Sequence, residues 1–410
     1  MKQFIFSHIL FATCLVIFLS LTTPVSAQDC YGDYVDSVAT VTIEFYYPSK
    51  FPGAPFTIDA SGKQIVFAGG NLQYNAAQNK WRFAEHQYDV IGDDLRGGNA
   101  TGTKDQGVII TGTKEDRATQ DKWIDLFQWG TSGYRNTYYE DKHNAQNYGA
   151  SAEKKYVYQP WDFEDRGNTR GLNSKLLNLY KGSLIDSSFI NKTELACESD
   201  WAWHNAITNG GCEVLESGQV CYTTAHKWYT PSAEELNYIA FKRSNASKLI
   251  GFATLKISGS DKHGIILLPD AWSWDAPGLE GWGAKWKPRW GCNVQATSAY
   301  EFKWNDNVLT EAEWDTFEDY GAVFLPATGA MQFGDWHWYD GHGIVNEYGE
   351  YWTGTCNAAG NGSNTIRFYT ITGVDHGSDG ADRYGALFMG GGTRSHLFSC
   401  AIRPVRVFTK

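Results

Sequence analysis

Tryptophans gathered in two segments are the residues of this sequence best suited to bind a ligand. Residues 270–290 contain five of the 17 tryptophans, and residues 335–339 contain two more beside a tyrosine. Gly, Asp, Lys and His surround these rings rather than apolar runs. An indole has a large apolar face, against which the C–H face of a sugar ring can stack. We therefore expect a glycan-binding site formed by Trp272, Trp274, Trp282, Trp286, Trp290, Trp336, Trp338 and Tyr339.

The same indoles have a second interpretation, in which they pack long loops that lack regular secondary structure. Large aromatic side chains are usually at least partly buried. The two interpretations are compatible, because a few exposed rings among many buried ones are enough to bind a sugar.

Three aspartates in a glycine-rich segment offer ligands for a hard cation. Asp375, Asp379 and Asp382 alternate with glycines and a serine, and carboxylates are the ligands that calcium prefers. Their spacing is not that of an EF-hand, so a solvated acidic turn is the alternative. Apart from this candidate calcium ion, the sequence indicates no cofactor.

Eight cysteines indicate disulfides rather than zinc ligands. No C-x-x-C pair occurs in the sequence, and structural zinc sites need ligands paired at short spacing. Cys212 and Cys221 lie close enough in the sequence to close a short hairpin, so we expect a disulfide between them.

The first 27 residues have the three parts of a secretory signal peptide. Lys2 precedes an apolar stretch, and Val25, Ser26 and Ala27 form a cleavage signal of small residues. We expect a mature chain that begins at Gln28 and is secreted or displayed at the cell surface. An oxidising compartment of this kind permits disulfides.

The charge of the chain restricts its partners. Forty-six Asp and Glu outnumber 35 Lys and Arg, for a net charge of −11, and no basic run occurs. Such a surface disfavours nucleic acids and anionic membranes. No segment after the signal is long and apolar enough to span a bilayer. The remaining partners are a glycan or another extracellular protein.

Short strands and a few capped helices predict an α+β domain. Capping boxes at Ser232 and Thr310 each precede a helix, and weaker helices are expected at 121–129 and 172–180. The predicted strands are residues 38–47, 64–68, 81–84, 108–111, 264–268, 322–325, 366–372, 386–389 and 401–408. We expect an N-terminal strand and linker over 28–60 and one domain over 61–410.

Three sequence runs resemble the formylglycine-generating-enzyme branch of the C-type-lectin-like fold. They are Y-T-P-S-A-E-E-L at 229–236, G-E-Y-W-T-G-T at 349–355 and S-C-A-I-R-P-V-R at 399–406. The runs F-A-G-G-N-L-Q-Y at 67–74 and W-R-F-A-E-H-Q-Y-D-V-I-G at 81–92 are similar to a family of paralogous secreted bacterial proteins built on that fold.

The resemblance implies a single elaborated C-type-lectin-like domain whose ligand loops lie between the strands at 265–268 and 351–353. It also implies that the strands bearing Cys356 and Cys400 are close, so a second disulfide between these cysteines is expected. The closely spaced cysteine pair of the oxidising enzymes does not occur. A non-catalytic, glycan-binding protein is therefore the first expectation. An altered enzyme of this branch and a structural or adhesive protein are the alternatives.

Overall fold

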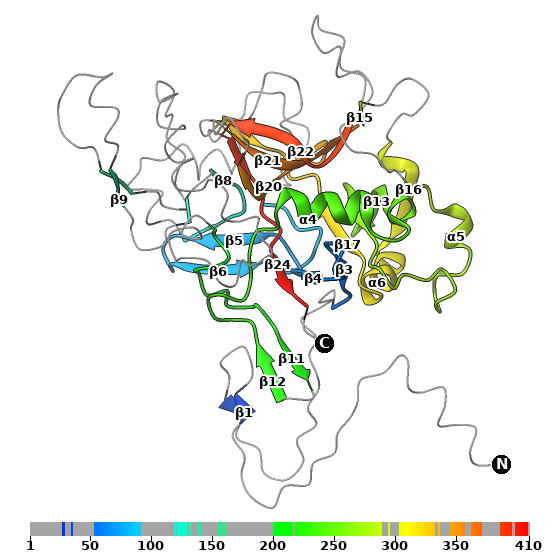
Figure 1. Cartoon of the computed structure of the whole chain (residues 1–410), viewed down its shortest axis with the longest axis horizontal. Helices are drawn as coiled ribbons and strands as arrows, with labels where there is room; N and C mark the ends of the chain where they lie inside the picture. The colour runs from blue at the N-terminus through cyan, green and yellow to red at the C-terminus, as the bar shows by residue number, and fades with distance from the viewer. Residues whose placement is uncertain are drawn as a thin grey trace, which may run out of the picture.

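The computed structural model describes about half of the chain. The described residues are 27–28, 34–35, 53–91, 119, 121–128, 131–132, 138–140, 155–157, 160, 200–215, 218–288, 294–295, 303–332, 335–336, 345–356, 362–370, 386–395 and 398–408. Short strands with few helices form them, which confirms the α+β class (Figure 1). The strands predicted at 38–47 and 108–111, and the helix at 172–180, lie outside these residues.

One four-stranded sheet is formed around a long hairpin. Its strand order is β16-β13-β14-β17. Ser258 and Gly259, both with positive φ, make the tight turn between β13 and β14, as a type I′ hairpin requires. The strands are β13 (Ile250–Ile257), β14 (Ser260–Leu267), β16 (Asn307–Thr310) and β17 (Val323–Pro326).

Helix α6 (Glu311–Asp319) follows β16 directly and supports this sheet. The Thr310 hydroxyl accepts from the backbone N–H of Glu313, whose carboxylate accepts from the backbone N–H of Thr310. The predicted capping box is therefore confirmed. Trp314 and Phe317 are buried on one side of the helix. A short 3₁₀ helix, η8 (Trp304–Asp306), precedes β16.

A second four-stranded sheet carries α4 on one face. Its order is β15-β22-β21-β20, and α4 (Ala233–Asn237) crosses beside it (Figure 1). A Cβ at Gly390 would lie within 3 Å of Ala233, so glycine permits this close approach. The strands are β15 (Val294–Gln295), β20 (Tyr348–Cys356), β21 (Gly362–Tyr369) and β22 (Ala386–Ser395).

The capping box at Ser232 is also confirmed. The Ser232 hydroxyl accepts from the backbone N–H of Glu235, and the Glu235 carboxylate accepts from the backbone N–H of Ser232. After α4 the chain continues as a π-helical turn, η6 (Tyr238–Lys242), and a 3₁₀ turn, η7 (Ala246–Lys248).

Three further sheets, made of shorter strands, and three hairpins complete the described part. The sheet orders are β24-β4-β3, β6-β5-β7 and β19-β18-β23-β8, and the hairpins are β1–β2, β9–β10 and β11–β12. Their bounds are β1 (Ala27–Gln28), β2 (Tyr34–Val35), β3 (Phe56–Thr57), β4 (Gln64–Phe67), β5 (Leu72–Asn75), β6 (Lys80–Phe83), β7 (Trp123–Ile124), β8 (Phe127–Gln128), β9 (Tyr138–Glu140), β10 (Lys155–Val157), β11 (Cys212–Leu215), β12 (Gly218–Cys221), β18 (Met331–Gln332), β19 (Asp335–Trp336), β23 (Phe398–Cys400) and β24 (Val405–Val407).

The sheet β24-β4-β3 joins the C-terminal strand to the earliest strand of the domain. Phe56 pairs with Ile65 and is fully buried, and Val405 pairs with Phe67. The linker expected up to residue 60 therefore includes a strand that belongs to the domain.

The helix predicted at 121–129 is wrong. Residues there form β7, which pairs with β5, and β8, which pairs with β23. These partners come from distant parts of the sequence, and such tertiary pairing overrides a weak local helical pattern. The described residues contain no helix that is both long and apolar enough to cross a membrane.

Candidate aromatic binding site

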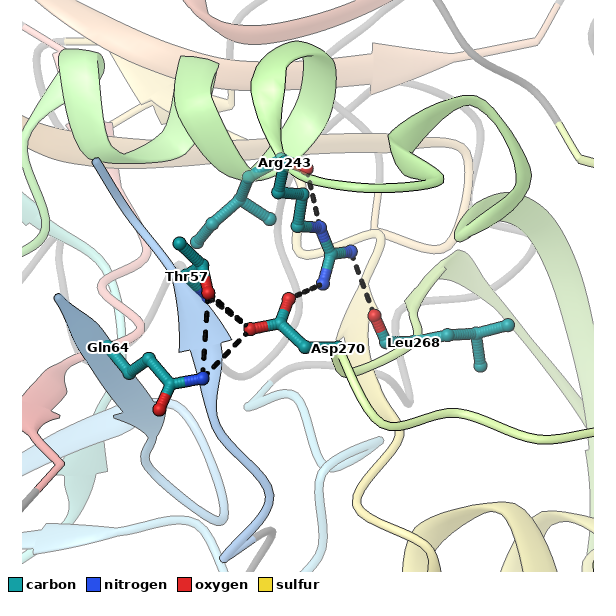
Figure 2. A network of polar contacts seen from close by, with 6 residues as sticks. Thr57, Gln64, Arg243, Leu268 and Asp270 are labelled. Atoms are coloured by element: carbon teal, nitrogen blue, oxygen red, sulfur yellow. Dashed lines mark hydrogen bonds and ion pairs between the residues drawn. The ribbon is translucent and has the colours of Figure 1, made fainter. Parts of the chain in front are cut away.

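An ion pair fixes the start of the tryptophan loop, residues 270–287, which follows β14. Asp270 accepts on Oδ2 from the Thr57 backbone N–H (2.6 Å), the Thr57 hydroxyl (2.7 Å) and Gln64 Nε2 (3.2 Å). Its Oδ1 lies 3.1 Å from Nη1 of Arg243. Figure 2 shows these contacts converging on one carboxylate from β3, β4 and the segment after η6. The first residue of the loop is thus bonded to three separate parts of the fold.

The Arg243 guanidinium donates hydrogen bonds to two backbone carbonyls in addition to its ion pair with Asp270. Its Nε donates to the Ile239 carbonyl (2.7 Å) and its Nη2 to the Leu268 carbonyl (2.8 Å). Burial lowers the pKa of Arg243, and the hydrogen bond and the charge of Asp270 act against that shift. The guanidinium therefore depends on Asp270 for its only described opposite charge.

The far end of the loop is also held. Trp286 Nε1 donates to the Lys248 carbonyl (2.9 Å), and the Lys287 backbone N–H donates to Asn307 Oδ1 (2.9 Å). The Trp286 ring lies so close to Gly251 that a Cβ there would lie 2.7 Å from it. A loop fixed at both ends can hold its side chains in one arrangement before any ligand arrives, which reduces the entropy lost on binding.

Four of the predicted tryptophans meet around Phe317 of α6. The ring centroids of Trp272, Trp274, Trp282 and Trp286 lie 5.0, 6.0, 5.1 and 6.3 Å from that of Phe317. Trp272 and Trp274 stand almost perpendicular, with centroids 5.3 Å apart. These four rings, with Phe317, are called the tryptophan cluster below.

Burial divides the tryptophan cluster into two pairs. Trp282 and Trp286, the latter in the turn after α5 (Trp282–Lys285), are 6% and 8% exposed. Trp272 and Trp274 are only partly buried. Trp282 and Trp286 therefore pack the loop, as the second sequence interpretation expects. The hypothesis of a sugar-stacking surface narrows to Trp272 and Trp274 among the described rings.

The structure does not describe the side chains of the other predicted ligand-binding residues. Trp336 lies in β19, and its side chain is not described. Trp290, Trp338 and Tyr339 lie outside the described residues. Asp375, Asp379 and Asp382, the predicted calcium ligands, also lie outside them. Within the described ranges, no group of three or more His, Cys, Asp or Glu side chains is arranged to hold a metal ion.

One predicted disulfide is confirmed and the other is wrong. Cys212 and Cys221 are paired directly across the β11–β12 hairpin and bonded, and Figure 1 shows this hairpin pointing away from the sheets. Cys400 is a free, buried thiol. Strand β20 meets the segment after β23 through Tyr351 and Ala401. Cys356 lies further along β20, by about 16 Å at ~3.3 Å per residue, beyond the ~7 Å that a disulfide allows.

Sequence reasoning missed the residues that organise the tryptophan cluster. Phe317 lies at its centre, and Tyr320, just after α6, contacts Trp272 and donates its hydroxyl to the Pro277 carbonyl (3.1 Å). The capping box at Thr310 predicted the helix that carries Phe317. No sequence signal showed that the tryptophan loop would cover that residue.

Comparisons of the chain with family models, with curated proteins and with solved structures gave no match.

Proposed function

We propose that this protein is a secreted or surface-displayed, non-catalytic glycan-binding protein. The observation that carries the proposal is the position of Trp272 and Trp274. Both rings keep part of their surface accessible, and both belong to a loop that is anchored at each end. Rigid aromatic side chains on a fixed loop lose little conformational entropy when a sugar stacks on them.

The arrangement of the strands supports the further proposal of a C-type-lectin-like fold. The resemblance implies that the 349–355 run and the 399–406 run lie on neighbouring strands. Tyr351 and Ala401 form a parallel bridge, and the Trp352 backbone N–H donates to the Ala401 carbonyl (2.9 Å). The capped helix α4 packs beside the same sheet. The tryptophan cluster then lies in the interval in which this fold carries its ligand loops.

The free thiol of the described part favours binding over catalysis. Burial, together with the nearby Glu350 carboxylate, raises the pKa of Cys400 well above its usual value. A thiolate, not a thiol, is the nucleophile in cysteine chemistry. Cys400 therefore supports no role as the reactive residue of an altered enzyme.

A glycan array with the mature protein, followed by calorimetric titration of each positive glycan, tests the proposal. Trp274→Ala should weaken binding by about 1–3 kcal/mol, with base–aromatic stacking as the analogue for a sugar ring. Tyr88→Phe, a conservative change of a buried aromatic in the same core, is the matched control. A blank array, or equal affinity of both variants, would overturn the proposal and favour an extracellular protein as the partner.

A further inference from the structure

One face of the sheet β15-β22-β21-β20 carries two arginines, Arg367 and Arg394, beside the carboxylate of Glu350. In β21, Ile366 and Phe368 belong to the main core. Alternation along a strand turns Arg367, which lies between them, to the opposite face. There the strand register places Glu350 of β20 and Phe388 of β22 on either side of Arg367. Figure 1 shows this sheet at the edge of the fold farthest from the β11–β12 hairpin.

The Glu350 carboxylate accepts hydrogen bonds from three side chains other than Arg367. Its Oε1 accepts from Thr365 Oγ1 (3.1 Å) and Arg394 Nε (2.7 Å). Its Oε2 accepts from the Tyr348 hydroxyl (2.8 Å) and again from Arg394 Nε (2.9 Å). The carboxylate is fully buried. Glu350 therefore accepts from Thr365, Tyr348 and Arg394, and its negative charge compensates that of Arg394.

Arg367 has no anionic partner among the described residues. Its guanidinium carbon lies 4.5 Å from the centroid of the Phe388 ring, and its Nε is shielded from solvent without a hydrogen-bond partner. A guanidinium has five N–H donors, and a donor that is shielded from solvent without an acceptor destabilises the unliganded state. The side chain is only partly buried, so a ligand can reach the rest of the group.

We propose that Arg367, with Arg394 beside it, binds an oxyanion, namely the carboxylate or sulfate group of a ligand. A planar guanidinium matches the two oxygens of such a group, and an aromatic ring behind it holds the plane in place. The two arginines and Glu350 have a net charge of +1, although the whole chain carries −11. At physiological ionic strength charges beyond about 8 Å are largely screened, so the local excess decides binding.

Calorimetric titration of the mature protein tests the site directly. The probes are sodium sulfate and glucuronic acid at fixed ionic strength, with glucose as the neutral counterpart of glucuronic acid. We expect both oxyanions to bind and Arg367→Gln to weaken both by about tenfold or more, because a hydrogen bond to a charged group is lost. Arg367→Lys, which keeps the charge but loses the planar fork, should weaken them less.

Arg82→Gln is the matched control, since Arg82 also stacks on an aromatic ring but has its own acceptor. Its guanidinium lies 3.9 Å from the Trp123 ring, and its Nε donates to Gln73 Oε1. We expect Arg82→Gln to bind both oxyanions with the affinity of the wild type.

Failure of the wild type to bind either oxyanion, or an unchanged affinity in Arg367→Gln, overturns the proposal. Should Arg367→Gln fail to fold by circular dichroism, an unchanged affinity in Arg367→Lys overturns it instead. Glycan binding at the tryptophan cluster is measured on the same preparations with neutral sugars, so the two proposals fail independently.

Discussion

The guanidinium of Arg243 and the carboxylate of Asp270 form an ion pair of 3.1 Å that joins the end of the α4–η6 helical segment to the start of the tryptophan loop. The arginine side chain is 1% exposed and the aspartate side chain 23% exposed. A charge so deeply buried needs a partner. The ion pair therefore couples the position of the tryptophan loop to the free energy of unfolding of the domain.

Asp270→Asn should lower the free energy of unfolding by about 2 kcal/mol, because it leaves the buried Arg243 without an opposite charge. Chemical denaturation measures the loss. Asp261→Asn is the control, since it breaks the exposed Lys256–Asp261 pair and should cost less than about 1 kcal/mol. Equal losses in the two variants would contradict the anchoring role of Asp270.

Trp282→Ala tests the packing half of the tryptophan cluster. The indole is buried against Phe317, so its removal should cost about 3–5 kcal/mol of stability. Trp274→Ala should cost less, because part of that ring already faces solvent. Thermal melts of both variants check this order, and a reversed order would mean that Trp274 is the packing residue.

Local signals in the sequence predicted the local structure well. The capping boxes at Ser232 and Thr310 depend on residues only three positions apart, and both helices begin where these residues place them. The Cys212–Cys221 hairpin is local in the same sense. The α+β class followed from many such signals together.

Features that depend on distant contacts were not predictable. Residues 123–124 and 127–128 form strands because their partners, β5 and β23, lie elsewhere in the sequence. The register of β20 against Ala401 decided that Cys356 and Cys400 do not meet. Likewise, only the structure shows that Trp282 and Trp286 are buried while Trp272 and Trp274 are partly exposed. Arg367 lies in an ordinary strand pattern, and only the structure shows that Glu350, opposite it on β20, is bonded to Arg394.

Arg403→Lys should destabilise the fold by about 3–5 kcal/mol, as expected when a buried charged group loses its partners. The Arg403 guanidinium is fully buried and donates to Asn71 Oδ1 and to the carbonyls of Ala68, Gln87 and Phe324. A lysine ammonium has three donors and no fork, so it cannot serve all four acceptors. Urea unfolding measures the loss, and Arg82→Lys is the partly exposed control. A loss below about 1 kcal/mol would show that the core can repack around lysine.

Thiol labelling checks the cysteine assignment. Cys400 should react with an alkylating reagent only after the protein is unfolded, because it is buried and its raised pKa keeps it protonated. Cys212 and Cys221 should react only after reduction. Peptide mapping without reduction distinguishes the cases, and a cross-linked peptide that contains Cys400 would contradict the structure.

The stability of the domain should fall as the pH rises from about 4 to about 7, because Asp125 is buried in a site that favours its neutral form. Burial raises the pKa of Asp125 from 3.8 to about 7, and the hydrogen bond from the Ile91 backbone N–H only partly opposes the shift. Its Oδ1 has no hydrogen-bond partner. The folded state thus binds a proton that the unfolded state has released, so this contribution is complete below pH 4 and lost through pH 7. At ~1.4 kcal/mol for each unit of pKa difference, the loss is roughly 4 kcal/mol.

Asp125→Asn removes the titrating group and should flatten the profile, while the exposed Asp275→Asn should leave it unchanged. Urea unfolding at a series of pH values measures both, and a wild-type slope retained in Asp125→Asn would assign the pH dependence to other groups, with Asp200 next in order because burial raises its pKa to about 6.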